Sequence, residues 1–134
     1  MRYMMIVTAT PKYEAGAPVE PALIEAIGRH SRKLIDAGIL VQAGGLQPSS
    51  KGARIGAKGG KLSVTDGPFT EAKELVGGFA IMELPSREEA IRLGKEFMQI
   101  HVDVLGPDYT GMLEIRPMFP SSNDPGIPPV NGSS

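Results

Sequence analysis

Residues 60–86 read GKLSVTDGPFTEAKELVGGFAIMELPS, and the rest of the chain can be understood from this stretch. A short run at 62–65 enters the sequence Asp-Gly-Pro-Phe at 66–69, where glycine permits positive φ and proline fixes φ, so the backbone must turn sharply. Two glycines then precede residues 79–84, a segment too apolar for a surface loop. The stretch therefore predicts a strand, a tight turn and a well-buried strand.

The segments before this stretch predict a strand, a helix and a second strand. Residues 2–8 are apolar at both odd and even positions, which indicates a strand covered on both faces. Residues 10–18 have the composition of a loop, after which Pro21 begins a helix that Gly38 ends. A strand is expected at 39–43, and glycine and proline then mark a polar connection.

The remaining elements are a hairpin, a second helix and a last strand. Within residues 53–65, two short runs flank Lys58-Gly59-Gly60 and predict a β-hairpin inserted at the edge of the sheet. Ser86 is the first residue of a capping-box pattern and begins a helix that extends to Gly106. Residues 112–119 alternate between apolar and polar side chains, which predicts the last strand.

The order of these elements is typical of a ferredoxin-like α+β fold, βαββαβ, with an inserted β-hairpin. Residues 1–119 are predicted to form one domain, and residues 120–134, which lack an apolar face, a flexible C-terminal tail. Two helices cover only one face of such a sheet, although the first strand is apolar on both faces. We therefore predict a homodimer in which a second copy covers the open face.

Composition narrows the classes of partner and site. The chain has 134 residues, no cysteine and a net charge of −1. The lack of cysteine excludes disulfides and thiolate metal sites, and it suits a reducing cytoplasm. A charge near zero provides no field that would attract nucleic acid, and no segment reaches the length needed to span a membrane. We therefore expect a cytoplasmic protein with no nucleic-acid and no membrane partner.

Several motifs together resemble one known family. They lie at 4–7 (MMIV), 37–40 (AGIL), 45–54 (GLQPSSKGAR), 65–74 (TDGPFTEAKE) and 114–117 (EIRP). On these motifs the sequence is similar to the YCII-related family, in the branch marked by Asp-Gly-Pro-Phe, over nearly all of residues 1–119. The resemblance implies a dimeric α/β barrel of ferredoxin-like subunits, with a pocket beside the interface. It implies no particular reaction, because most members have none assigned.

Asp66 and His30 are the candidate catalytic residues. Asp66 lies on a constrained turn, where a carboxylate can act as a base, or where it accepts the backbone N–H groups of the turn and has only a structural role. His30 shares a helical face with Leu23 and Ile27, which directs it at the sheet or at the rim of the interior. There it is either a core histidine or a general acid or base, and His101 on the second helix leaves the same alternatives open.

Arg54, Phe69, Glu71 and Lys73 are the candidate ligand-binding residues. The guanidinium of Arg54 suits a carboxylate or phosphate, and the alternative is a solvated edge hairpin. Phe69 is a pocket wall or a core anchor, and Glu71 and Lys73 contact either a ligand or solvent. No histidine cluster has the spacing of a metal site and no glycine motif fits a nucleotide, so we expect no metal and no cofactor.

Two functions from different classes follow from these residues. The first is binding of a small anionic organic compound, with acid–base catalysis of the lyase or isomerase type, because Asp66, Arg54 and His30 are three chemical types that one pocket can hold. The second is a non-catalytic regulatory or protein-interaction module, which the family resemblance suggests through a link to sigma-factor-dependent transcription. The sequence alone does not decide whether the chain is an enzyme.

Overall fold

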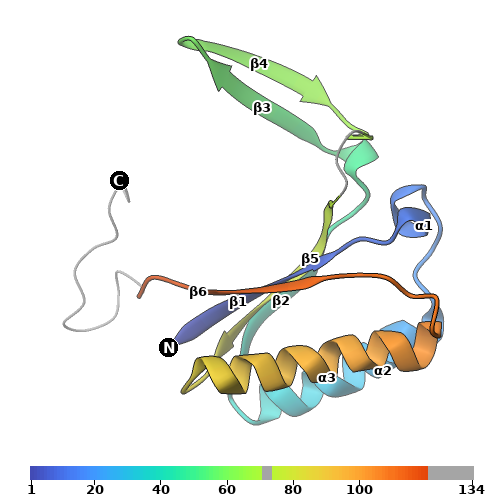
Figure 1. Cartoon of the computed structure of the whole chain (residues 1–134), viewed down its shortest axis with the longest axis vertical. Coiled ribbons are helices and arrows are strands. Elements are labelled where there is room, and N and C mark those ends of the chain that lie inside the picture. Colours follow the sequence, from blue (N-terminus) through green and yellow to red (C-terminus); the bar gives the residue numbers. More distant parts are fainter. Residues whose placement is uncertain (71–73, 121–134) are drawn as a thin grey trace.

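The computed structural model of the chain describes residues 1–70 and 74–120 (Figure 1). The candidate residues Glu71 and Lys73, and the predicted tail from residue 121 onward, lie outside the described residues. In order, the elements are β1 (Arg2–Thr8), α1 (Pro11–Glu14), α2 (Pro21–Asp36), β2 (Leu40–Gly45), the 3₁₀ turn η1 (Ser49–Lys51), β3 (Ala53–Lys58), β4 (Lys61–Asp66), β5 (Val76–Glu83), α3 (Arg87–Leu105) and β6 (Leu113–Pro117).

The main sheet is four-stranded and antiparallel, with the strand order β2-β5-β1-β6. The two long helices, α2 and α3, both lie against the same face of this sheet (Figure 1). This is a mixed α+β architecture, compatible with the predicted ferredoxin-like fold. Because β5 pairs with β1 on one side and β2 on the other, the strand predicted to be well buried lies inside the sheet.

The core lies between the sheet and the two long helices. In β1, Tyr3 and Met5 are buried, and Met4 between them points at the other face because strand side chains alternate. The register places Tyr3 opposite Met82 of β5, so both strands direct side chains at the helices. Leu93 of α3 is almost fully buried in the same cluster, and burial of such a side chain contributes about 1.5–3 kcal/mol.

Local signals set the ends of the long helices as predicted. Pro21 stands in the first turn of α2, where a missing backbone N–H removes no helical hydrogen bond. Ser86 is the N-cap of α3, and its Oγ accepts the backbone N–H of Glu89 at 3.2 Å. The same helix ends at Gly106, whose φ of 92° lies in the left-handed region that glycine favours.

The predicted hairpin forms, but its place in the fold differs from the prediction. β3 and β4 are joined by Gly59 and Gly60, with φ values of 58° and 78°, and they make a separate two-stranded sheet, not an extension of the main sheet. Every residue of both strands is exposed, and the hairpin stands on the side of the main sheet away from α2 and α3 (Figure 1). Hydrophobic periodicity predicts a hairpin but not which distant strand it joins.

Two further segments differ from the prediction. The loop expected at 10–18 contains α1, which begins where Thr10 Oγ1 accepts the backbone N–H of Tyr13 at 3.2 Å. β2 continues through Gly44 and Gly45, which the sequence assigns to a connection. A Cβ on Gly44 would lie 3.0 Å from the ring of Phe79, so a side chain there would require this ring to shift by a few tenths of an ångström.

The second face of the main sheet is partly exposed in the single chain. At its centre lie half-buried apolar side chains from β1 and β5, namely Met4, Ile6, Phe79 and Ile81. The outer strand β6 alternates as predicted, with Leu113 and Ile115 toward the helices and charged residues on this second face. We call this surface the open face.

Candidate functional site

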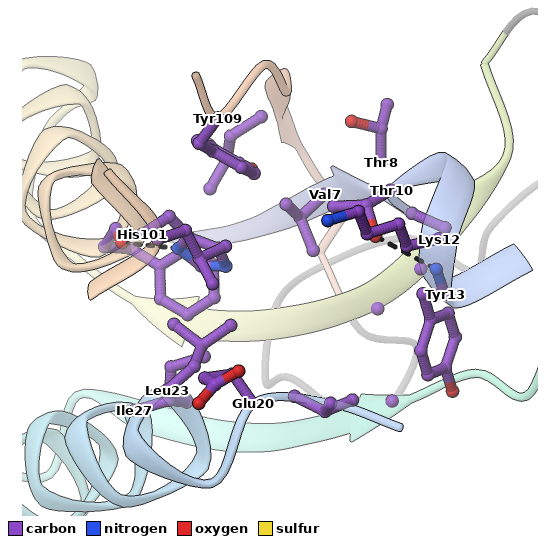
Figure 2. Close-up of a pocket in the computed structure, with 18 of the residues that line it drawn as sticks. Val7, Thr8, Thr10, Lys12, Tyr13, Glu20, Leu23, Ile27, His101 and Tyr109 are labelled. Carbon is purple, nitrogen blue, oxygen red and sulfur yellow. Dashed lines mark hydrogen bonds between the residues drawn. The ribbon is translucent and has the colours of Figure 1, made fainter. Parts of the chain in front are cut away.

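A cavity of about 950 Å³ lies between the helix-facing side of the sheet, the start of α2 and the end of α3 (Figure 2). Cavities of about 300–1,000 Å³ are typical of small-molecule sites. α1 and the loop after α3 complete its walls. Most of the lining is apolar, with the large side chains Val7, Leu23, Ile27, Phe97, Leu105 and Leu113.

The cavity exists because the sheet carries small residues at this end. On the helix-facing side, β5 places Gly78 opposite Gly45 of β2, and Ala80 opposite Ala43. Further along the same face of β5, Met82 is large and fills the core. Since alternate residues of a strand share a face, this change from large to small side chains leaves space beneath the helices.

His101 of α3 is the buried polar residue of the cavity wall, with 7% of its surface exposed. Its Nδ1 lies 2.9 Å from the carbonyl oxygen of Phe97, and because a carbonyl only accepts, Nδ1 carries a hydrogen and donates. In the neutral ring Nε2 is then an acceptor, and Figure 2 shows the ring turned with this nitrogen toward the cavity. The rings of Phe97 and Tyr109 flank it, with centroids 4.8 and 5.2 Å away.

Tyr109 lines the cavity next to His101. Its hydroxyl oxygen is buried and has no hydrogen-bond partner among the described residues. The hydroxyl packs directly on Gly111, where a Cβ would collide with it. Burial raises the pKa of the Tyr109 phenol above its usual value of 10.0, because the ionised form loses hydration.

Charged side chains surround the opening of the cavity. Lys12 of α1 and Glu20 just before α2 enter the lining from different walls (Figure 2), and Asp108 joins them from the loop after α3. All three are exposed, and none has an ion pair with another described side chain. Tyr13, beside Lys12, donates its hydroxyl hydrogen to the carbonyl of Leu46 at 2.6 Å and so holds α1 in place.

The Asp-Gly-Pro-Phe turn lies at the base of the hairpin, outside the cavity lining. Gly67 does not have a positive φ; glycine is needed instead because a Cβ would collide with the carbonyl of Ser49. Its N–H donates to the carbonyl of Gly52 at 2.9 Å. Asp66 is exposed at the end of β4, and its carboxylate has no hydrogen bond to the described backbone of the turn.

Hydrogen bonds through Ser49 connect this turn to α1. The N–H and the hydroxyl of Ser49 donate to the two carboxylate oxygens of Glu14, each at 2.6 Å, and the same hydroxyl accepts the N–H of Phe69 at 3.1 Å. Phe69 is buried, and the guanidinium carbon of Arg54 lies 4.0 Å from the centroid of its ring. The structure thus brings Arg54 and Phe69 together, close to Asp66 in the hairpin register.

His30 lies in a different region, between α2 and α3. Its Nε2 is 3.2 Å from one carboxylate oxygen of Glu96, and Arg92 donates to the other at 2.7 Å. His30 and Glu96 border a small outer groove between the helices. Because the helices and the hairpin stand on opposite sides of the sheet, the structure does not bring His30 and Asp66 together (Figure 1).

Sequence reasoning identifies few of the cavity residues. It leaves His101 as an ambiguous core position and does not single out Lys12 or Tyr109. The paired glycines at 44–45 and 77–78 are a sequence signal for the cavity, although glycine pairs are usually interpreted as the ends of strands. Glycines at matching positions of two neighbouring strands mark a place where a sheet has no side chains to fill the space above it.

Neither a metal centre nor a membrane span is found in the part of the chain that the structure describes. Within residues 1–70 and 74–120, no group of three or more His, Asp or Glu side chains is arranged to hold a metal ion. The helices of the same ranges include none that is long and apolar enough to cross a membrane.

Comparison with known proteins agrees with the motifs. The model of the YCII-related domain matches residues 1–99. An uncharacterised protein of Rhizobium meliloti (strain 1021) is 31% identical over 87 residues, which are 65% of this chain and 65% of that protein. The match therefore spans slightly less than two thirds of that relative. By the extent of the domain match, the chain belongs to the YCII-related family.

Proposed function

We propose that this protein binds a small organic molecule in the cavity between the sheet and the helices. The observation that carries the proposal is the geometry of His101, a buried imidazole with one nitrogen fixed by a backbone carbonyl and the other turned toward an apolar cavity. Nε2 has no hydrogen-bond partner among the described residues, and a bound molecule with a donor supplies one.

The same imidazole is suited to acid–base catalysis, which we include in the proposal. A neutral ring accepts a proton at Nε2, and the carbonyl of Phe97 both orients the ring and stabilises the Nδ1–H of the imidazolium that forms. This chemistry is proton transfer to and from the bound molecule, as in a lyase or isomerase. Asp66 and His30 stand outside the cavity lining, so this version of the reaction does not use them.

The binding proposal is tested by filling the cavity. Ala80 lies on its floor, so Ala80→Leu removes space without adding charge. We expect NMR screening of small phenols and carboxylic acids to find compounds that bind the natural protein, with binding weakened at least about tenfold by Ala80→Leu because the added side chain occupies ligand volume. Ala57→Leu on the exposed hairpin is the matched control and leaves binding unchanged. Binding that survives Ala80→Leu, or no binding by the natural protein, contradicts the proposal.

We also propose that two copies associate through the open face, as in the dimeric α/β barrel that the resemblance implies. The apolar side chains at the centre of this face are only partly covered in the single chain, and apolar surface left uncovered in this way marks interfaces. The hairpin stands on the same side of the sheet, so a copy covering the open face lies beside it (Figure 1). On one face the hairpin carries three large apolar side chains with most of their surface exposed, Ile55 (73%), Leu62 (76%) and Val64 (69%).

A second candidate function is a protein-interaction module, and the amphipathic hairpin favours it. The face opposite the apolar one carries Arg54, Lys58 and Lys61, which suits a partner with apolar and acidic surface. Leu62→Asp together with Val64→Asp tests this second function. We expect the change to abolish partner binding and to leave ligand binding in the cavity intact, because the hairpin lies outside the cavity lining.

A further inference from the structure

We infer that the ligand of this cavity is an uncharged hydroxylated aromatic compound, whose hydroxyl group donates a hydrogen bond to Nε2 of His101. The inference rests on the proposed function, namely that the cavity binds a small organic molecule. It also differs from the small anionic ligand that the sequence predicts. Three properties of the described lining carry it: the polarity of His101, the shape and composition of the walls, and the balance of charge at the opening.

The hydrogen-bond acceptor at Nε2 of His101 favours a ligand with a hydrogen-bond donor. Because the Phe97 carbonyl fixes the hydrogen on Nδ1, the Nε2 of the neutral ring has only a lone pair to offer. A hydroxyl group satisfies that lone pair, whereas an ether, a ketone or a carboxylate presents only acceptors. A ligand without a donor cannot form this hydrogen bond, which lowers its affinity relative to a ligand that has one.

The walls select a flat and largely apolar body. The floor of the cavity is formed by glycine and alanine from two neighbouring strands, Gly78 and Ala80 of β5 and the residues opposite them in β2. Strand backbone that carries no side chain larger than a methyl group presents a flat surface. Around His101 the rings of Phe97 and Tyr109 add aromatic surface, against which another ring packs favourably in an offset or edge-on arrangement.

The charges at the opening disfavour an anion. The described lining contains one cation, Lys12, and two carboxylates, Glu20 and Asp108. The charged residues of the lining therefore give no net attraction for a carboxylate ligand, which also loses hydration on entering an apolar cavity. A neutral compound is not repelled by the carboxylates, and it loses less hydration than an anion on entering the cavity.

Three probes of nearly equal size test the inference in the natural protein. Para-ethylphenol has a hydroxyl donor, para-ethylanisole has the same oxygen without the hydrogen, and para-ethylbenzoate has a carboxylate. We expect NMR titration to give dissociation constants in that order of increasing value, with the phenol about five to ten times tighter than the anisole, the ratio that one hydrogen bond provides. This series requires no variant and stands even if a cavity variant fails to fold.

A matched pair of histidine variants then assigns the hydrogen bond. The chain has two histidines, of which His101 lies in the cavity wall and His30 lies outside it. We expect His101→Phe to abolish the preference for the phenol over the anisole, and His30→Phe to preserve it. In the natural protein, the phenol is expected to shift the Nε2 resonance of His101 and leave that of His30 in place.

The possible results separate failure of the hydroxyl inference from failure of the proposed ligand binding. Equal affinities for the phenol and the anisole, or a preference that persists in His101→Phe, overturn the hydroxyl inference while ligand binding by the cavity stands. Tightest binding of the benzoate, lost in Lys12→Ala, overturns it in favour of an anion. If none of the probes binds and the broader screen also finds nothing, both the inference and the proposed function fall.

Discussion

Tyr109 and Tyr13 place the same hydroxyl group in opposite situations. The first is buried without a partner among the described residues, and the second donates to the carbonyl of Leu46 at 2.6 Å. We expect Tyr109→Phe to raise the free energy of unfolding by about 1 kcal/mol, because it removes an uncompensated polar group, and Tyr13→Phe to lower it by about 1 kcal/mol. Urea denaturation of both variants checks this pair. A loss of stability in Tyr109→Phe equal to that in Tyr13→Phe contradicts the unpaired hydroxyl.

The pKa of Tyr109 also predicts a pH dependence. Burial raises the pKa of this phenol in the folded state, so as pH rises the unfolded chain releases the proton first. The stability contributed by the neutral phenol is complete below the unfolded pKa of about 10 and is lost as pH rises toward the folded pKa. We expect the natural protein to lose more stability than Tyr109→Phe between about pH 9 and pH 11. Parallel denaturation curves across that range would contradict the shift.

Single residues also show where sequence reasoning succeeds and where it fails. Ser86 was identifiable as a cap because its partner, the N–H of Glu89, is three residues away. Gly44 was read as a breaker, although it continues a strand and makes room for the ring of Phe79. The reason for that glycine lies in a neighbouring strand, and one sequence does not contain that contact.

The base of the hairpin depends on a glycine for steric reasons. A Cβ on Gly67 would collide with the backbone of Ser49, which cannot rotate away, whereas a Cβ on Gly28 in α2 meets nothing within 4 Å. We expect Gly67→Ala to lower the free energy of unfolding by about 1–3 kcal/mol, as overpacking does. Gly28→Ala, the control with the same chemical change, raises it by about 0.5–1 kcal/mol because alanine favours helix. Thermal denaturation checks both signs, and a neutral Gly67→Ala is the contrary result.

Whole elements were predictable where their pattern is long enough. α2, α3 and the alternating strand β6 each have a periodicity that fixes which side faces the core. α1 spans only Pro11–Glu14, too short for any period, and it is held by two tertiary hydrogen bonds that Ser49 donates to the carboxylate of Glu14. A capping threonine followed by proline was its only local signal.

Association of two copies is a property of the whole molecule, and one substitution tests it. Ile81 lies at the centre of the open face, so Ile81→Lys places an unpaired charge in the proposed interface. We expect sedimentation velocity to show a dimer for the natural protein at micromolar concentration and a dissociation constant raised about a hundredfold or more in the variant. Ile24→Lys is the control, because Ile24 is 59% exposed on α2 and away from the open face. A natural protein that sediments as one chain, or a variant that stays dimeric, rules out this interface.

At the scale of the molecule, the α+β class was predictable and the cavity was not. The order of the elements along the chain follows from local signals, and a βαββαβ order indicates the class. The cavity arises from an absence of side chains at matching positions of β2 and β5, under the ends of two helices. For that reason most candidate residues predicted from the sequence lie near the Asp-Gly-Pro-Phe turn, which is a distinctive motif. His101 was not selected as a site residue.

The hydrogen bonds of Ser49 join two parts of the molecule that face different surroundings. Ser49 donates hydrogen bonds to Glu14, which belongs to the short helix that also contains the cavity residue Lys12. The hydroxyl of Ser49 also accepts the N–H of Phe69, at the base of the hairpin. Because one hydroxyl group contacts both segments, we expect a change in the position of the short helix to affect the base of the hairpin as well.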